Sequence, residues 1–115
     1  MVIRENQMDA FRDSLHAEYV RRLMRRMRDR FASQFAAMPE SALRQWVDLG
    51  LAKARRYGYD RENEVELFID LCAECGLDFD RQPWATAILS DTTLGSREKL
   101  VRVDDYVVFV LRNAK

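Results

Sequence analysis

Glycine, proline, cysteine and histidine are all scarce in this chain of 115 residues, which contains four Gly, two Pro, two Cys and one His. A fold built from many short strands needs frequent tight turns, which Gly and Pro usually supply, so their scarcity argues against an all-β architecture. Four glycines also argue against a Gly-rich phosphate-binding loop. With so few sulfur and imidazole ligands, one chain does not provide the four that a structural zinc site requires.

Long apolar runs and net charge are lacking as well. No apolar run approaches the roughly 20 residues that cross a bilayer, and charged residues from Arg4 onward, rather than an apolar signal segment, follow Met1-Val-Ile. We therefore expect a cytoplasmic protein that does not associate with membranes. The 19 Lys and Arg residues balance 19 Asp and Glu residues, and zero net charge weakens any general attraction to nucleic acid.

The residues that are abundant favour helices. Glu, Arg, Leu and Ala dominate the chain and are good helix formers. Hydrophobic residues make up 48% of the chain and charged residues 33%, a balance typical of a folded domain rather than a disordered one. We predict an all-α protein in which residues 1–115 form a single compact domain of about five helices.

A long amphipathic helix is predicted at the N-terminus, from about Asn6 to Met38, where Pro39 stops it. A strict four-residue step overshoots the 3.6 residues of a helical turn, so the apolar stripe winds around this helix, which then bends or meets different neighbours at its two ends. The stripe consists of Phe11, Leu15, Tyr19, Leu23, Met27, Phe31 and Phe35.

Turn and capping residues indicate where the remaining helices begin and end. The second helix begins at Pro39-Glu40-Ser41 and ends at Gly58. Asp60 is a suitable N-cap for a third helix, which Gly76 ends.

A short fourth helix runs from Pro83 to Leu89, and Ser96 caps a fifth. The apolar run from Tyr106 to Leu111 also suits a strand, but we favour helix because the chain offers no second strand to pair with it.

Charge of each sign is concentrated in one part of the sequence. Six arginines lie between Arg21 and Arg30, and eight acidic residues lie between Asp60 and Asp80. Four-residue spacing aligns side chains along one face of a helix. It defines an arginine row, which consists of Arg22, Arg26 and Arg30, and a carboxylate row, which consists of Glu62, Glu66, Asp70 and Glu74.

Three roles are open for the two rows. They can neutralise each other within the fold or be solvated, or at least one of them can contact a partner protein. Arginine also suits phosphate, but the acidic helix would repel a polyanion and no known nucleic-acid-binding motif is present. Nucleic acid is therefore the least favoured partner.

Cys72-Ala-Glu-Cys75 resembles a redox or zinc motif, but its position argues against both. A redox pair places its first Cys at the N-terminus of a helix, whereas this pair comes at the end of one. We expect buried cysteines on an apolar face, with zinc shared across a dimer as the remaining alternative. His16 lacks a recognisable nucleophile or base partner, and no Glu-x-x-His motif of a di-iron bundle occurs. The sequence therefore predicts no catalytic, metal or cofactor site.

Aromatic residues cluster near the predicted helix junctions, among them Tyr57, Tyr59, Phe79 and Trp84. Most are expected in the core. An exposed Tyr or Trp would be a natural anchor for a partner, and Tyr59 is our candidate.

Three local motifs stand out between Ala54 and Leu89: the Tyr57-Gly58 helix end, the turn Gly76-Leu-Asp-Phe-Asp80, and the helix Trp84-Ala-Thr-Ala-Ile-Leu89. With them the chain resembles a family of small bacterial proteins that are encoded beside type VI secretion effector and spike-tip genes, over most of its length and most clearly from Ala54 to Leu89. It implies an accessory role in the delivery or neutralisation of a toxin, and it carries over no catalytic residues.

Composition and resemblance together predict a non-enzymatic protein that binds a cognate toxin, or a spike component, as an effector chaperone or adaptor. The alternative is an immunity protein that blocks the toxin, and a homo-oligomer is also compatible with the sequence. The expected contact residues are the arginine row, the carboxylate row and Tyr59.

Overall fold

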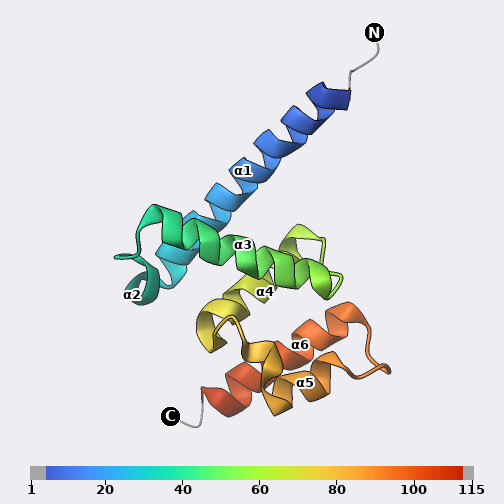
Figure 1. The fold of residues 1–115 in the computed structure, drawn as a ribbon. Helices are drawn as coiled ribbons and strands as arrows, with labels where there is room; N and C mark the ends of the chain where they lie inside the picture. The colour runs from blue at the N-terminus through green and yellow to red at the C-terminus, as the bar shows by residue number, and fades with distance from the viewer. Residues whose placement is uncertain (1–4, 113–115) are drawn as a thin grey trace. The chain divides into compact units, whose positions relative to one another are not determined.

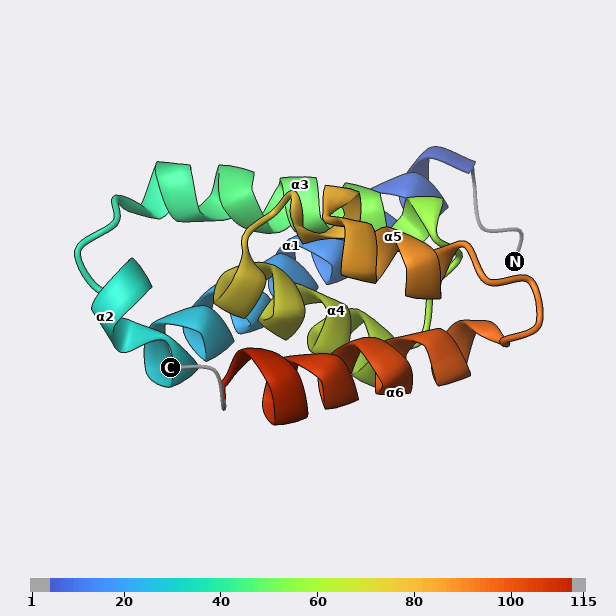
Figure 2. The same cartoon turned by 90° about the horizontal axis from the view of Figure 1, so that it is seen from below.

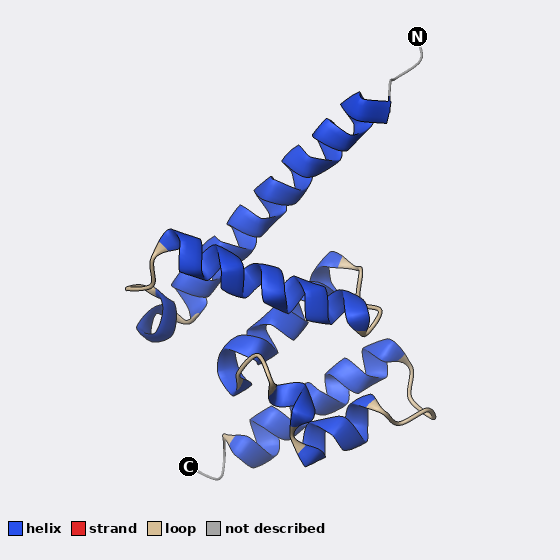
Figure 3. Ribbon diagram, in the orientation of Figure 1, coloured by secondary structure: helices blue, strands red, loops and turns tan. Residues whose placement is uncertain are grey.

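The computed structural model describes residues 5–112, with side-chain environments from residue 14 onward. Regular structure within these residues is helical, and Figure 3 shows no strand among them. The all-α class is therefore confirmed. The elements are α1 (Glu5–Arg30), α2 (Ala32–Phe35), α3 (Glu40–Arg56), α4 (Glu62–Cys75), the 3-10 helix η1 (Phe79–Arg81), α5 (Pro83–Leu89), α6 (Ser96–Tyr106) and the π-helix η2 (Val107–Leu111) (Figure 1).

The described residues fall into two compact units that divide after Asp48. The expectation of a single domain stays a prediction.

The long N-terminal helix ends earlier than the sequence indicates. α1 ends at Arg30, and Phe31 adopts a non-helical backbone with φ −127° and ψ 49° before α2 begins. The expected extent of this helix to Met38 is therefore wrong, and the break at Phe31 is the bend that the winding stripe left open. Each four-residue step turns the apolar stripe by about 40°, so a straight helix would carry Phe35 out of phase with the residues buried earlier. After the break Phe35 is fully buried, with its ring 4.8 Å from that of Trp46.

Arg28 secures the chain after this break. Its guanidinium donates hydrogen bonds to the carbonyl oxygens of Ala36 at 3.1 Å and Met38 at 2.9 Å. These carbonyls lie where a continuous helix would have supplied its own donors, so a side chain replaces the missing backbone partners.

α3 begins where the sequence predicts. It starts at Glu40, and the backbone N–H of Leu43 donates to the carbonyl of Pro39. Four apolar residues of this helix are buried, whereas Trp46 is half-buried. The buried positions are Leu43, Val47, Leu51 and Ala54.

Gly50 permits close packing between α3 and α4 in the second unit. A Cβ atom at this position would lie 2.5 Å from Cδ1 of Ile69, closer than side chains tolerate. The helices approach at this point because Gly50 has no side chain.

The start of α4 corrects one capping prediction. The helix begins at Glu62 with Arg61 at the cap and no side-chain cap bond, so Asp60 is not the N-cap. Asp60 lies one residue too early to reach the free N–H groups of the first turn. Glu62 and Glu64 favour this end through the helix dipole instead.

Helices run through the C-terminal part of the second unit. α5 begins at Pro83 as predicted, and α4 and α5 both pack against α6 (Figures 1 and 2). Ser96 is the first residue of α6 and Gly95 occupies the cap, so the prediction that Ser96 caps this helix is off by one position. The apolar run that also suited a strand continues α6 as η2, which confirms helix.

Gly76 ends α4 in a conformation that few residues other than glycine adopt. Its φ is 98° and its ψ 153°, and nothing lies within 4 Å of the position of a Cβ atom. Replacement by alanine would therefore act through backbone strain alone. We predict that Gly76→Ala lowers the free energy of unfolding by about 1–3 kcal/mol, measured by urea denaturation.

Gly95→Ala is the matched control, because the φ of Gly95 is −72° and its nearest Cβ neighbour would be 3.5 Å away. It should change stability by less than about 0.5 kcal/mol. Equal stability of the two alanine variants would contradict this interpretation of Gly76.

Candidate functional site

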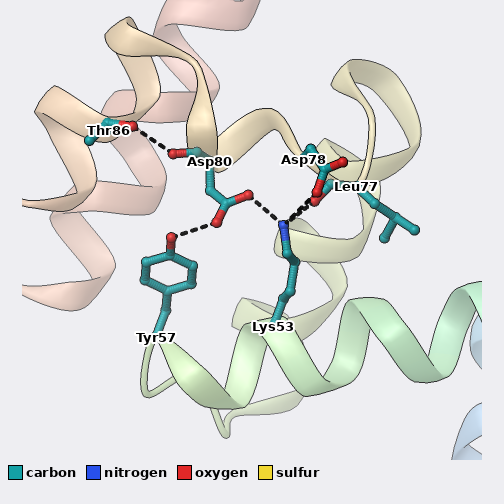
Figure 4. Close-up of polar contacts among 6 residues, drawn as sticks. All are labelled: Lys53, Tyr57, Leu77, Asp78, Asp80 and Thr86. Carbon is teal, nitrogen blue, oxygen red and sulfur yellow. Dashed lines mark hydrogen bonds and ion pairs between the residues drawn. The ribbon is translucent and has the colours of Figure 1, made fainter.

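The second unit contains a cluster of ionisable groups that are largely withdrawn from water, centred on Lys53 and Asp80. Lys53 lies in the last turn of α3, and Tyr57 follows the end of that helix, with its backbone N–H donating to the carbonyl oxygen of Lys53 at 3.2 Å, so both side chains project toward the turn that follows α4 (Figure 4). The turn is short because Gly76 ends α4 and η1 begins at Phe79. Both sides of the cluster are therefore set by backbone structure.

Lys53 is held by groups of that turn. Its Nζ donates to Oδ1 of Asp80 and to the carbonyl oxygen of Leu77, each at 2.5 Å, and lies 3.4 Å from Oδ1 of Asp78. The side chains of Lys53 and Asp80 are 14% and 12% exposed, whereas that of Asp78 is 74% exposed. The buried pair therefore accounts for most of the interaction, because a pair open to water contributes little.

Asp80 has partners on each of its polar groups. Its Oδ2 accepts a hydrogen bond of 2.7 Å from the Tyr57 hydroxyl, and its carbonyl oxygen accepts one of 2.7 Å from Oγ1 of Thr86 (Figure 4). Burial by itself would raise the pKa of the carboxyl group, but the hydrogen bonds from Lys53 and Tyr57 and the lysine charge outweigh it and lower the pKa.

The same contacts keep Tyr57 protonated. Burial first, then the hydrogen bond to Asp80, raises the pKa of Tyr57 to about 12. At neutral pH the tyrosine is thus a fixed donor and the aspartate a fixed acceptor. The arrangement suits a structural clamp, which we call the Lys53–Asp80 clamp, better than proton transfer, which needs a group whose pKa lies near the working pH.

A row of aromatic rings runs beside the clamp. Phe68 of α4 lies 5.9 Å from Tyr57, 5.8 Å from Tyr59 and 5.5 Å from Phe79, measured between ring centroids. The row continues through Trp84, which stacks on Tyr106 at 4.4 Å. Of the four aromatic residues predicted near the helix junctions, Tyr59 and Phe79 are buried in the core, whereas Tyr57 and Trp84 are half-buried, so the prediction that most of them belong to the core holds for two of the four.

Tyr59 corrects a proposed contact residue. Its side chain is 1% exposed, and its hydroxyl donates to the carbonyl oxygen of Ser96 at 2.8 Å. The ring is therefore a core element that connects the loop before α4 to the start of α6, and it is not an exposed anchor for a partner.

The two cysteines are free thiols. Cys72 is buried, as expected, and burial raises its pKa to about 12. Cys75 is half-buried, and burial together with the nearby Glu74 charge raises its pKa as well. Neither thiol is activated toward the thiolate that redox chemistry and metal binding use. Within the described residues, no three His, Cys, Asp or Glu side chains are grouped so that they could hold a metal ion.

Glu74 of the carboxylate row pairs with Arg112, the residue that follows η2. Its two carboxylate oxygens accept hydrogen bonds of 2.5 and 2.7 Å from Nε and Nη2 of Arg112. This pairing raises the pKa of Arg112. The two residues line a hollow of about 300 Å³ with Cys75, Gln82, Val107 and Leu111. The sequence did not predict this pair, since 38 residues separate its members.

The other members of the two charge rows also interact within the structure. Arg22 places its guanidinium carbon 5.4 Å from the centroid of the Tyr19 ring. Each remaining member takes part in a polar, ionic or electrostatic interaction of its own. Glu66 and Asp70 are half-buried, and so is Arg26. The charged side chains of both rows therefore interact within the structure. Their role as contact residues for a partner stays a prediction.

Comparisons with protein families, with curated proteins and with solved structures find no match to this chain. Among the helices that the structure describes, none combines the length and the apolar character needed to cross a membrane. The resemblance of residues 54–89 to a secretion-associated family stays a prediction.

The clamp leads to a prediction about stability at neutral pH. Asp80→Asn removes the carboxylate and leaves the Lys53 ammonium without its buried counter-charge. We expect this variant to lose about 1–3 kcal/mol of unfolding free energy in urea denaturation. Asp78→Asn alters an exposed carboxylate near the same Nζ atom and should change stability by less than about 0.5 kcal/mol. Similar losses in the two variants would count against the clamp.

The lowered pKa of Asp80 leads to a prediction about acid. The unfolded chain has the ordinary value of 3.8 and the folded chain a lower one. Ionised Asp80 thus stabilises the fold above 3.8, and this stabilisation is lost as the pH falls through the folded pKa. The stability difference between the natural chain and Asp80→Asn should be constant from about pH 7 to about pH 5 and shrink below about pH 4. Urea denaturation across this range measures it, and a difference that grows in acid would refute the assignment.

Proposed function

We propose that this protein is a non-enzymatic accessory of a bacterial type VI secretion toxin system that binds a cognate effector as a chaperone or adaptor before loading. The resemblance of residues 54–89 supports the system. The same residues serve to hold the fold together, and this supports binding through the exposed surface as the activity.

The residues that carry the resemblance serve the fold. Tyr57 and Asp80 belong to the Lys53–Asp80 clamp, and Phe79 and Trp84 belong to the row of aromatic rings. Gly76 ends α4 with a backbone that glycine favours. A family related through such residues shares a scaffold, and recognition then depends on the surfaces that the scaffold displays.

The C-terminal helix displays apolar side chains to solvent. Val101 of α6 is 49% exposed, and Phe109 and Val110 of η2 are 66% and 44% exposed. Aromatic and aliphatic side chains at the surface are the usual anchors of a protein interface. This helix is the surface that we assign to the effector. The immunity alternative relies instead on the carboxylate row, whose members already interact within the structure.

Val101→Lys tests this assignment with little risk to the fold, because the side chain is half exposed and lies on a regular helix. Coexpressed with its cognate effector, the variant should retain at least about tenfold less effector in a pull-down, the loss expected of an interface anchor. Leu49→Lys changes a side chain of 57% exposure on α3 and should retain normal capture. Equal capture by both variants would exclude the C-terminal helix.

A gene deletion and a coexpression experiment distinguish the chaperone or adaptor role from the immunity role. If the protein is a chaperone or adaptor, deletion of its gene lowers effector accumulation or secretion. If deletion instead leaves secretion intact and coexpression protects cells from the toxin, the protein is an immunity factor and the proposal is wrong.

A further inference from the structure

A hollow lined by arginines lies in the first unit, on a face of α1. Its volume is about 320 Å³, and it is lined by Arg21, Met24, Arg25, Arg28 and Glu40. The three arginines are spaced by four and three residues, which places them along one helix face. They are not members of the arginine row.

The hollow carries uncompensated positive charge. Three guanidinium groups against the one carboxylate of Glu40 leave a net charge of +2 on the lining. In the part of the chain that the structure describes, no hydrogen bond or ion pair involves Arg21 or Arg25, and both are exposed. They contrast with the arginine row, every member of which interacts within the structure.

Arg28 gives the hollow a fixed cation. Its guanidinium is held by the carbonyl oxygens of Ala36 and Met38. Carbonyl groups orient a guanidinium without neutralising it, so the positive charge stays available to a ligand. A cation that is already positioned loses less conformational entropy when an anion binds.

We propose that this hollow binds an acidic segment of a partner protein, whose carboxylates pair with Arg21, Arg25 and Arg28. Guanidinium groups bind carboxylates through two parallel hydrogen bonds, and the arginine stems and Met24 offer an apolar surface for a neighbouring side chain. The ligand is thus a short peptide of mixed acidic and apolar residues.

Two observations favour a peptide over nucleic acid. Glu40 lies in the lining, where its carboxylate repels the closely spaced phosphates of a nucleic-acid backbone. Nucleic acid also gains affinity from many phosphate contacts, whereas only Arg21 and Arg25 are free of other polar partners among the six arginines between residues 21 and 30. One or two carboxylates of a peptide are enough to pair with Arg21 and Arg25.

The inference rests on the proposed function insofar as the acidic segment would belong to the bound effector. Its test does not, because it uses synthetic peptides. Fluorescence anisotropy of the full chain is measured with a labelled Glu-Leu-Asp-Glu-Leu-Asp peptide and with its uncharged counterpart, Gln-Leu-Asn-Gln-Leu-Asn. A labelled single-stranded oligonucleotide is the third probe.

We expect the acidic peptide to bind at least about tenfold more tightly than its uncharged counterpart. The double variant Arg21→Glu with Arg25→Glu should lose at least about tenfold of that affinity, and the milder variant Arg21→Gln with Arg25→Gln should lose part of it. Arg44→Glu with Arg61→Glu makes the same change of charge at exposed positions outside the hollow and should bind within about twofold of the natural chain. Circular dichroism checks that each variant is folded.

Equal binding of the two peptides, or no binding of either, would overturn the proposal, as would tighter binding of the oligonucleotide. If the chain captures its effector in cells but ignores the acidic peptide, the hollow is excluded while the proposed function stands. If the chain binds the peptide through Arg21 and Arg25 but captures no effector, the proposed function is excluded while the peptide site in the hollow stands.

Discussion

The ion pair between Lys53 and Asp80 is the contact on which the second unit depends most. Both side chains are largely withdrawn from water, and the Lys53 ammonium, both Asp80 carboxylate oxygens and the Tyr57 hydroxyl are hydrogen-bonded. A buried pair of this kind does not gain its importance from a large net attraction, because removing two charges from water offsets much of it. Its importance lies in specificity, since the turn after α4 can satisfy both charges when it is placed against α3 as observed.

The fold of the second unit follows from this contact and from two glycines. Gly76 ends α4 so that Asp80 returns toward α3, and Gly50 lets α3 and α4 approach closely. The aromatic rings around Phe68 then fill the space between α4, η1 and the loop before α4. Most of these residues, although not Gly50 and Lys53, lie within residues 54–89, so the resemblance that we propose for that stretch is one of scaffold. Function is therefore to be sought on the exposed side chains of α6, η2 and α1.

Local signals in the sequence predicted most of the helices. The start of α3 at Glu40, the end of α4 at Gly76 and the start of α5 at Pro83 follow from capping and turn chemistry, which depends on residues close in sequence. The break at Phe31 was not predicted as a break, because a winding apolar stripe is compatible with either a bend or a change of neighbours. Asp60 and Ser96 were each assigned as caps one position away from the actual cap, an error typical of helix boundaries.

The candidate sites were less predictable than the fold. In the clamp, Asp80 is 27 residues from Lys53 and 23 residues from Tyr57, and no periodicity connects Asp80 with either of them. Charge spacing identified the arginine row. Arg21 and Arg25, which have no polar partner among the described residues, lie on the neighbouring face of α1. On that face Arg28 is fixed by carbonyl groups that a continuous helix would not have left available. Tyrosine is a common residue type at interface anchors, but Tyr59 is buried. Its residue type could not reveal this, because burial depends on tertiary packing.

The most direct test of this account is a double-mutant cycle between Lys53→Met and Asp80→Asn, with unfolding free energies measured in urea at neutral pH. If the two side chains form the buried clamp, the double variant should be more stable than the sum of the single losses implies, with a coupling energy of about 1–3 kcal/mol. A coupling energy within about 0.3 kcal/mol of zero would show that the two residues act independently. The clamp, and the scaffold role assigned to the surrounding residues, would then be wrong.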